Sequence, residues 1–457
     1  MNIDPSIFKA YDIRGIYPTN LNEEIAYRIG RAYSKIIKKE NIGQTDKIVV
    51  ANDMRLSTPN LKKSLIKGLL DSGVDILDIG LATTPTFYFA VAYFGFKGGI
   101  QVSASHNPKE YNGFKIVRAK SVPFSSETGI NHIRDLVIKN VFLAVAKKGK
   151  LTKKNDVLGK LIEIQSKGIN LKSINKFKIA VDAANAMGAI DMNALFKILP
   201  CKLIKLNFKL DGSFPVHQPD PLAEENLKYL QEKVLKHHAD FGISIDGDGD
   251  RYFLIDEKGE IIRQEILRGI MAQIAIKENP KAKVCYDIRP GRITKDMIDE
   301  VGGKAVVTRV GHSLIKEKML ETKAVFGGES SGHYFYKFPF GTFEAPIVLV
   351  LKFLVYLSKQ NKPLSEVVKT YKKYFHSGEI NSEVRDKDTK IKEIARKYSN
   401  AEISYLDGIT IIYPDFWFNV RPSNTENLLR LNLEAVSQKL MEKKRDEVLK
   451  FIRSENE

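Results

Sequence analysis

Three aspartates at alternate positions make up the loop Asp246-Gly-Asp248-Gly-Asp250-Arg251. Apolar runs flank it on both sides, FGISI before and YFLID after. Glycine removes steric bulk between the acids, so their hard oxygen ligands can converge on one Mg²⁺. An EF-hand calcium loop is excluded, because Arg251 stands where that loop requires glycine and the flanks are strand-like. A solvated acidic turn is disfavoured as well, because three acids so close repel one another unless a cation joins them.

A candidate nucleophile lies in the segment Ser103-Ala104-Ser105-His106-Asn107-Pro108, directly after the strand-like run around Ile100. A serine beyond a strand end, between small and turn-favouring residues, is anchored by its backbone and accessible, as a nucleophile must be. The alternative is a plain Ser/Asn turn closed by proline. A serine-hydrolase interpretation lacks support, because the segment has no GxSxG elbow and no identifiable acid–histidine partner order.

A glycine-bounded cluster, GGESSGH, covers residues 327–333. Its Glu329 and Ser331 could present an acceptor and a donor to neighbouring hydroxyls, which suits a sugar. The alternative is a glycine-rich surface turn, in which His333 would be a structural histidine.

The last cluster is Arg421-Pro-Ser423-Asn424-Thr425-Glu, with Arg430 on the next element. Arginine forks, hydroxyls and turn amides match the geometry of a phosphate group. A capped helix start at Ser423 or Thr425 is the alternative, and both roles can coexist because helix N-termini bind anions.

The elements that must position these clusters alternate short β-branched runs with longer amphipathic stretches. This pattern is typical of α/β domains built on mainly parallel sheets. The predicted buried strands are 47–50, 100–102, 179–182, 241–245 and 284–287. Several of them end in a polar cluster, and ligands bind beyond the carboxyl ends of strands in open α/β sheets.

The length of 457 residues predicts three or four domains rather than one core. Candidate boundaries are the lysine-rich stretch 147–156, the turn 256–259 and the polar stretch 358–363. The predicted segments are therefore 1–150, 151–256, 257–362 and 363–457. The first three suit α/β domains, whereas the last has sparser strands and a charged helix at 438–452, which indicates a smaller α+β domain.

The composition bounds the function classes. A formal net charge of +17 is compatible with nucleic acid, a membrane surface or a small anionic substrate, but the lysines are spread out and accompany no recognisable nucleic-acid module. No run approaches the ~18 apolar residues that span a bilayer. The N-terminus lacks the features of a secretory signal, and two cysteines cannot build a disulfide framework, so we expect a cytoplasmic protein.

Taken together and in chain order, the clusters resemble the α-D-phosphohexomutase superfamily, in particular its phosphomannomutase/phosphoglucomutase type. The resemblance spans nearly the whole chain and rests on FKAYDIRG at 8–15, the serine segment, DGDGDR, Gly311-His312-Ser313 with Lys316, GGESSGH and RPSNTE. It implies three similar mixed α/β domains, a smaller C-terminal α+β domain and an active site in a central cleft.

Carried over motif by motif, the resemblance implies that Ser105 is the phosphoserine and that Asp246, Asp248 and Asp250 bind Mg²⁺ together with an oxygen at Ser105. Around the transferring phosphoryl group it places Arg14, Lys115 and Arg251. It offers three candidates for moving the hydroxyl proton: Lys115, His106 and His333. The implied substrate-binding residues are Glu329 and Ser331 at two sugar hydroxyls, Tyr11, Arg289 and His312 elsewhere in the sugar pocket, and Arg421, Ser423, Asn424, Thr425 and Arg430 at the non-reacting phosphate.

The implied activity interconverts hexose 6-phosphate and hexose 1-phosphate, of mannose or glucose, through phosphoserine and a hexose 1,6-bisphosphate that is both intermediate and activator. The implied partner is a phosphosugar, with neither nucleic acid nor membrane. Two departures affect sugar preference. Asn427 stands where relatives usually have proline, and Ser330 replaces the Met or Gln common in the sugar loop, residues 327–333. The main alternative is phosphoglucosamine mutase, whose closing loop usually reads SGTE and differs at Asn424. A phosphoserine-using phosphatase would leave the sugar and phosphate loops without a purpose.

Overall fold

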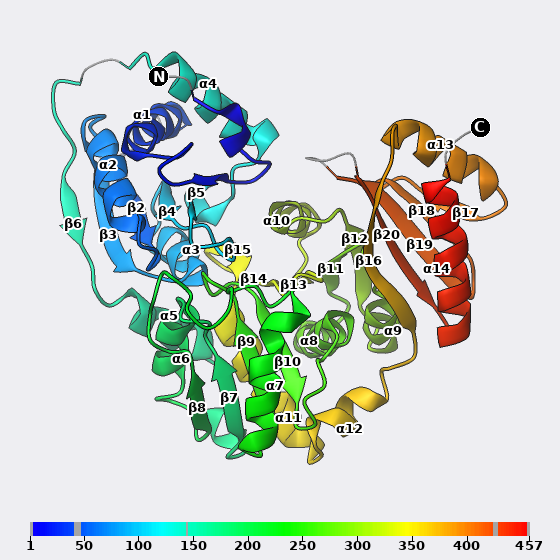
Figure 1. Ribbon diagram of the computed structural model, residues 1–457. Coiled ribbons are helices and arrows are strands. Elements are labelled where there is room, and N and C mark those ends of the chain that lie inside the picture. The colour runs from blue at the N-terminus through cyan, green and yellow to red at the C-terminus, as the bar shows by residue number, and fades with distance from the viewer. Residues whose placement is uncertain (1–2, 41–46, 143–144, 424–427, 455–457) are drawn as a thin grey trace. The chain divides into compact units, whose positions relative to one another are not determined.

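The computed structural model describes residues 3–40, 47–142, 145–423 and 428–454. The chain divides into two compact units (Figure 1). Unit 1 comprises residues 1–262 and 331–365, and unit 2 comprises residues 263–330 and 366–457.

The first sheet of unit 1 has the strand order β1-β5-β4-β2-β3-β6. Its strands are β1 (Ile13–Ile16), β2 (Lys47–Asn52), β3 (Asp75–Leu81), β4 (Gly98–Val102), β5 (Tyr111–Arg118) and β6 (Leu151–Lys153). The pairs β2–β3, β2–β4 and β3–β6 are parallel, whereas β5 is antiparallel to both β1 and β4. Its helices are α1 (Glu23–Glu40), α2 (Thr58–Leu70), α3 (Thr84–Tyr93) and α4 (Asn131–Lys139). Because β6 pairs with β3, the first sheet extends past residue 150.

The second sheet of unit 1 has the order β10-β9-β7-β8. Its strands are β7 (Lys178–Asp182), β8 (Lys202–Leu206), β9 (Phe241–Ile245) and β10 (Tyr252–Asp256), accompanied by α5 (Val157–Ser166), α6 (Gly188–Leu195) and α7 (Lys228–Lys236). Strand β7 is parallel to β8 and β9, and β10 folds back antiparallel to β9. Unit 1 also contains the antiparallel hairpin β14 (Tyr334–Phe338) and β15 (Gly341–Glu344), followed by α11 (Pro346–Gln360), which contacts α5.

Unit 2 begins with a parallel set of strands in the order β12-β11-β13. These are β11 (Lys283–Asp287), β12 (Lys304–Thr308) and β13 (Phe326–Gly328), with α8 (Gln264–Glu278), α9 (Arg292–Glu300) and α10 (His312–Thr322). Helix α12 (Leu364–Lys369) brings the chain into the rest of unit 2. There an antiparallel sheet, β16-β20-β19-β18-β17, comprises β16 (Phe375–Glu383), β17 (Glu402–Ser404), β18 (Ile409–Ile412), β19 (Phe416–Pro422) and β20 (Leu428–Ala435), with α13 (Lys387–Lys397) and α14 (Gln438–Arg453).

Burial explains why the sequence forms these strands. Strands β4 and β9 are buried at every residue and consist mostly of glycine and apolar residues. The one amide side chain among them, Gln101 of β4, accepts from the Thr84 hydroxyl at 2.8 Å and donates to the carbonyl of Ala82 at 2.9 Å. In unit 2, Met441, Val448 and Ile452 of α14 recur at intervals of seven and four residues, which places them on one face of the helix, and they belong to the core cluster of the antiparallel sheet.

The fold class predicted from the sequence is confirmed: mixed α/β sheets with mostly parallel strands precede a C-terminal α+β part. The expectation of sparse strands in the last segment was wrong, because β16 to β20 occupy much of it. Its strands FWFNVRP and LLRLNLEA contain polar residues that hide them from a search for apolar runs. Within the described residues, no helix is long and apolar enough to cross a membrane.

Candidate active site

Ser105 lies in the turn beyond the carboxyl end of β4, and it adopts the left-handed backbone conformation with φ of 50°. This region is uncommon for residues other than glycine and is a frequent mark of functional sites. The hydroxyl is buried, donates to Asp246 Oδ2 at 2.9 Å and lies 3.2 Å from His106 Nδ1. A base and a carboxylate therefore hold the predicted nucleophile from two sides.

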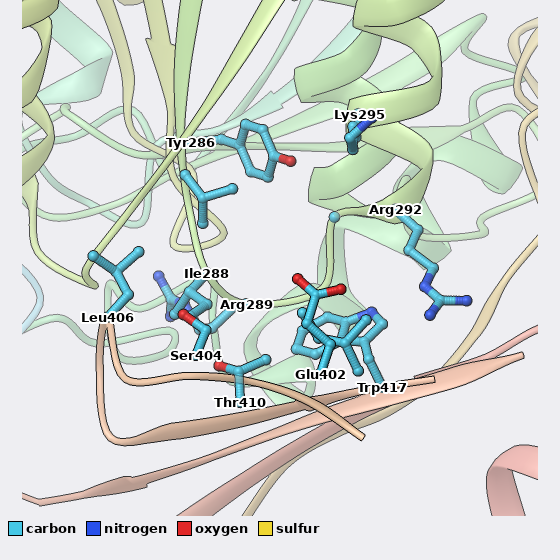
Figure 2. Close-up of a pocket in the computed structure, with 13 residues that line it drawn as sticks. Tyr286, Ile288, Arg289, Arg292, Lys295, Glu402, Ser404, Leu406, Thr410 and Trp417 are labelled. Carbon is cyan, nitrogen blue, oxygen red and sulfur yellow. The ribbon is translucent and has the colours of Figure 1, made fainter. Parts of the chain in front are cut away.

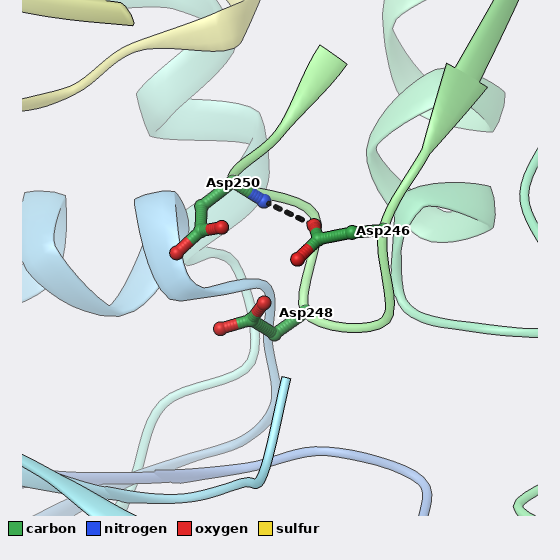
Figure 3. A group of neighbouring side chains, drawn as sticks. All are labelled: Asp246, Asp248 and Asp250. Atoms are coloured by element: carbon green, nitrogen blue, oxygen red, sulfur yellow. Dashed lines mark hydrogen bonds between the residues drawn. The ribbon is translucent and has the colours of Figure 1, made fainter. Parts of the chain in front are cut away.

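The three carboxylates of the β9–β10 loop converge, as Figure 3 shows. One oxygen or more of each of Asp246, Asp248 and Asp250 lies within 4.8 Å of the others, and all three residues are buried. Backbone amides of residues 249–251 donate to Asp246 Oδ1 at 3.0–3.2 Å and fix the loop. Burial, together with the two neighbouring carboxylates, raises the pKa of Asp246 well above its ordinary value. Such a cluster needs cations to stay ionised.

These residues fit a divalent cation by the chemistry of their donors. Carboxylate oxygens are the ligands that Mg²⁺ prefers. Moreover, Asp248 Oδ1 is buried and accepts no hydrogen bond from the described residues. A buried acceptor without a donor is costly unless another group satisfies it.

Two cationic side chains contact the carboxylates directly. Lys115 Nζ lies 2.6 Å from Asp248 Oδ2 and 2.8 Å from Asp250 Oδ2. Burial lowers the pKa of Lys115, but the two carboxylates outweigh it and the pKa is raised well above its usual value. Arg251 Nε lies 4.0 Å from Asp246 Oδ2; its buried Nη1 lies 3.9 Å from Asp220 Oδ1, too far for a hydrogen bond, and has no hydrogen-bond partner among the described residues. That guanidinium nitrogen could donate to an anionic ligand.

Arg14 approaches the serine segment from β1. Its Nε donates to Asp12 at 2.7 Å, and its Nη1 donates to Asn107 Oδ1 and more weakly to Ala104 O at 3.4 Å. Tyr11 lies on the same segment, just before β1, and is half-buried.

The two predicted histidines of unit 1, His106 and His333, have different surroundings. Burial, together with the charges of Arg251 and Arg14, lowers the pKa of His106 well below its usual value. His333 lies between Asp250 Oδ1, 3.1 Å from its Nε2, and Ser331 Oγ, 2.8 Å from its Nδ1. The structure thus brings all the predicted catalytic residues of unit 1 into one cluster, and Ser331 joins it through His333.

The serine segment and the β9–β10 loop approach each other closely at Gly247. A Cβ on Gly247 would lie 2.2 Å from the carbonyl oxygen of Ser105, a distance that real Cβ atoms do not adopt. The N-terminus of α3 supports the same loop, because Thr84 N donates to Asp248 O at 2.9 Å and the Thr84 hydroxyl donates to the Asp248 carboxylate.

Arg55 was not predicted, yet it organises the serine segment. The side chain is buried beyond β2, and its guanidinium donates at 2.6–3.0 Å to four backbone carbonyls, those of Ser105, Asn107, Pro108 and Tyr111. Asp53 lies 3.3 Å from its Nε. The sequence signal was available, because Asp53 and Arg55 are polar residues directly after a strand.

In unit 2, Arg289 and Glu329 contact each other, with Arg289 Nη2 3.3 Å from Glu329 Oε1. The amide of Gly311 also donates to Glu329 Oε1 at 3.1 Å, and His312 follows as the first residue of α10. Fully buried Asp287 accepts from Arg289 Nε at 2.6 Å. Three of the predicted sugar-binding residues are therefore neighbours.

The predicted phosphate residues of unit 2 meet on β19 and β20. Arg421 and Arg430 are register partners, and Glu379 of β16 lies 2.6 Å from Arg421 Nη2 and 3.5 Å from Arg430 Nη1. Among the described residues, the buried Nε atoms of both arginines lack hydrogen-bond partners. Ser423 is buried at the end of this hairpin, whereas Asn424 and Thr425 lie outside the described residues.

A cavity of about 350 Å³ in unit 2 borders Arg289 (Figure 2). Its lining combines apolar side chains such as Ile288, Leu406 and Trp417 with Arg292. Arg292 donates to the carbonyls of Tyr413 and Pro414, so its guanidinium is already engaged.

Comparison with known proteins agrees with the geometry. Models of phosphoglucomutase/phosphomannomutase match in chain order: alpha/beta/alpha domain I at residues 5–143, domain II at 160–259, domain III at 265–374 and the C-terminal domain at 379–451. The chain is 39% identical to a phosphomannomutase of Methanocaldococcus jannaschii, with 98% of each chain covered, and 38% identical to one of Escherichia coli K12, with 94% of each covered. A phosphoglucomutase/phosphomannomutase family protein of Burkholderia thailandensis has a similar crystal structure, with a TM-score of 0.91, 32% identity and coverage of 99% of this chain and 98% of that one.

Fold and site together define a multidomain α/β enzyme in which a serine lies against a buried cluster of three carboxylates. The chain belongs to the phosphoglucomutase/phosphomannomutase family.

Proposed function

We propose that this enzyme is a phosphohexomutase that interconverts the 6-phosphate and 1-phosphate of mannose and of glucose. The observation that carries the proposal is the contact of Ser105 Oγ with Asp246, at 2.9 Å, inside a three-carboxylate cluster of a chain whose relatives over its full length are named phosphomannomutase.

Ser105 is the proposed phosphoryl carrier. In the first half-reaction the Oγ–P bond of phosphoserine breaks while the free hydroxyl oxygen of the substrate bonds to phosphorus. The hydroxyl proton leaves by way of His106, Lys115 or His333, and the departing Oγ of Ser105 takes up a proton. Because the pKa of Lys115 is raised, Lys115 can accept the hydroxyl proton only in exchange for one that it gives to Oγ. The hexose 1,6-bisphosphate then reorients and returns its other phosphoryl group to Ser105. Free hexose 1,6-bisphosphate would act as an activator by phosphorylating Ser105.

Arg14, Lys115 and Arg251 are proposed to surround the transferring group. Nη1 of Arg251 supports this role, because it lacks a hydrogen-bond partner among the described residues and an anionic oxygen would satisfy it. Mg²⁺, held by the three aspartates and an oxygen at Ser105, would supply positive charge against the transferring phosphoryl group.

Residues of unit 2 are proposed to bind the remainder of the substrate. Glu329 would hold a sugar hydroxyl, with Ser331 of unit 1 at a second one, and Arg289, His312 and Tyr11 would complete sugar recognition. The non-reacting phosphate would be bound by Arg421, Ser423, Asn424, Thr425 and Arg430. The Nε atoms of Arg421 and Arg430 support this assignment, because neither has a hydrogen-bond partner within the described part of the chain.

The proposed domains are residues 1–150, 151–256, 257–362 and 363–457. Four domain models matching in this order support the division. The first boundary falls next to β6, which pairs within the first sheet.

The test is kcat/KM for mannose 1-phosphate, glucose 1-phosphate and glucosamine 1-phosphate under one condition in a coupled assay. Mannose and glucose differ only at C2, while the proposed contacts of Glu329 and Ser331 are the C3 and C4 hydroxyls. A loop without a dedicated C2 partner discriminates weakly, because strong rejection requires a buried polar group left unpaired by the wrong substrate. We expect the two epimers to differ by roughly tenfold or less, or about 1.4 kcal/mol.

We expect the glucosamine value to be the lowest. A glucosamine value well above the other two would replace the proposal by phosphoglucosamine mutase. Release of inorganic phosphate without isomerisation would replace it by a phosphatase.

A further inference from the structure

The structure points to Arg268 of α8 as a residue that positions the sugar-binding pair Arg289 and Glu329; this inference rests on the function proposed above. Arg268 is fully buried, and so is its ion-pair partner Asp287, 2.7 Å away. Neither residue is among those that the sequence motifs indicated.

Every nitrogen of the Arg268 guanidinium donates a hydrogen bond. Its Nε donates to Thr294 Oγ1 at 3.1 Å and its Nη2 to the carbonyl of Pro290 at 2.8 Å. Its Nη1 donates to Asp287 Oδ1 at 2.7 Å and to Ser330 Oγ at 3.2 Å. The planar fork is therefore fixed in one orientation, which a lysine ammonium could not reproduce.

The backbone leaves room for this side chain. A Cβ on Gly328 would lie 2.7 Å from Cγ of Arg268, and a Cβ on Gly291 would lie 3.0 Å from its Nη2. Glycines at the end of β13 and in the turn before α9 thus permit a buried arginine beside the sugar loop.

Asp287 connects Arg268 to Ser330 and to Arg289 by hydrogen bonds. Its Oδ1 accepts from Arg268 and from the Ser330 hydroxyl at 2.8 Å, and its Oδ2 accepts from Arg289 Nε at 2.6 Å. Arg289 in turn contacts Glu329 at 3.3 Å. Charges alternate along this series, Arg268, Asp287, Arg289 and Glu329, so each member is paired with the next.

This series explains the unusual Ser330. Its hydroxyl binds Asp287 and Arg268 rather than a ligand, so the serine ties the sugar loop to α8. Removing Arg268 would leave a buried carboxylate with one cation instead of two, and Asp287 would then compete with Glu329 for Arg289.

The experiment measures binding in a Ser105→Ala background, in which turnover is expected to be lower by orders of magnitude. Titration calorimetry gives the Kd of glucose 1-phosphate and of inorganic phosphate for the parent and for Arg268→Met. We expect the Kd of glucose 1-phosphate to rise about tenfold, because a hydrogen-bonded charged contact loses its orientation. The Kd of inorganic phosphate should stay within about twofold, since the phosphate residues are not part of the series.

A double-mutant cycle separates positioning from general loosening of the fold. In a Glu329→Gln background, Arg268→Met should weaken glucose 1-phosphate binding far less than in the parent, because the residue it acts through is already altered. Gln273→Met is the matched control: Gln273 is a buried polar residue of the same helix, and it donates to Met297 O and Glu300 Oε2 away from the series. It should leave both dissociation constants unchanged.

If Arg268→Met does not fold, Arg268→Lys and Ser330→Ala take its place, each with an expected loss of about threefold for glucose 1-phosphate alone. Equal losses for both ligands, or losses that add in the Glu329→Gln background, would overturn the positioning role while leaving the mutase assignment intact. A parent that binds no hexose phosphate would instead remove the proposed function, and this inference with it.

Discussion

Ser105, the proposed phosphoryl carrier, has a strained backbone conformation. Its left-handed backbone conformation has a cost of order 1–3 kcal/mol for a non-glycine residue, so its surroundings must fix it. Arg55 binds its carbonyl at 2.7 Å, and Gly247 packs against the same carbonyl. The strain is thus offset by contacts that aim the hydroxyl at Asp246.

Replacing Ser105 by alanine should lower turnover by orders of magnitude, because the proposed phosphoryl carrier is lost. Intact-mass spectrometry should show that the phosphoprotein form disappears. Circular dichroism should be unchanged, since the methyl group keeps the packing and the backbone contacts of Arg55 do not involve the side chain. A fully active Ser105→Ala enzyme would contradict the mechanism.

Asp248→Asn tests the metal site while preserving the shape of the side chain. Oδ2 of Asp248 pairs with Lys115, and its Oδ1 is the buried acceptor without a donor among the described residues. Loss of this anionic ligand should weaken Mg²⁺ binding, so that activity collapses and excess Mg²⁺ restores it only in part. Normal activity of wild-type enzyme after chelator treatment would show that the metal assignment is wrong.

At the scale of single residues, the sequence indicated the side chains that could do chemistry but not the side chains that hold them in place. Ser105 and the three aspartates were visible from type and spacing. Arg55 follows a predicted strand, but its role was not apparent, because it binds carbonyls 50 or more positions away that only folding brings near. Arg268 was not visible, because its partners Asp287 and Ser330 lie 19 and 62 positions away on other elements.

At the scale of elements, the site depends on the turns at the ends of strands and on the first residues of helices. The turn after β4 bears Ser105, the β9–β10 loop bears the aspartates, and the first residue of α3 binds Asp248. Thr83 caps α3 and its hydroxyl donates to Asp191 of α6 at 2.8 Å. That carboxyl is buried, and burial raises its pKa to about 7.

Asp191 therefore makes stability depend on pH. The folded protein favours the protonated acid, so its contribution is fully present below about pH 4, falls as pH rises and is lost above about pH 7. The rise in the pKa of Asp191 from 3.8 to about 7 corresponds to a loss of stability of roughly 4 kcal/mol at most. Asp191→Asn cannot ionise and its amide oxygen can still accept from Thr83, so we expect it to unfold at a higher temperature than wild type at pH 8.

The measurement is the difference in melting temperature between Asp191→Asn and wild type at pH 5 and at pH 8. The difference should be larger at pH 8 by several degrees. An equal difference at both values would mean that Asp191 ionises in the folded protein as readily as in the unfolded chain.

Buried strands were easier to predict from the sequence than partly exposed ones. The continuous apolar runs that became β7, β9 and β11 were predicted within a residue or so of their bounds. The antiparallel strands of unit 2 were underestimated, because partly exposed strands such as β16 carry too many polar residues to be recognised by apolar content.

At the scale of the whole molecule, the excess of 17 positive charges is spread along the chain and not gathered in one motif. Such a field raises the local concentration of an anionic substrate without reading its structure. The lysines of the segment 147–154 illustrate the distribution: they are exposed, and Lys148 forms an ion pair with Asp71.

The last prediction concerns this field. Because salt screens exposed charges, with a Debye length of about 30 Å at 0.01 M and 3 Å at 1 M, kcat/KM for glucose 1-phosphate should fall several-fold as ionic strength rises over that range. The value of kcat should change less than about twofold, since the buried ion pairs of Lys115 are screened much less. Changing Lys147, Lys150, Lys153 and Lys154 to glutamine should reduce the salt dependence only slightly, because four of 72 basic residues contribute little to a distributed field. A kcat/KM that does not vary with ionic strength would mean that the charge has no part in capturing substrate. Tight, steeply salt-dependent binding of duplex DNA in a filter assay would instead assign the charge to nucleic acid.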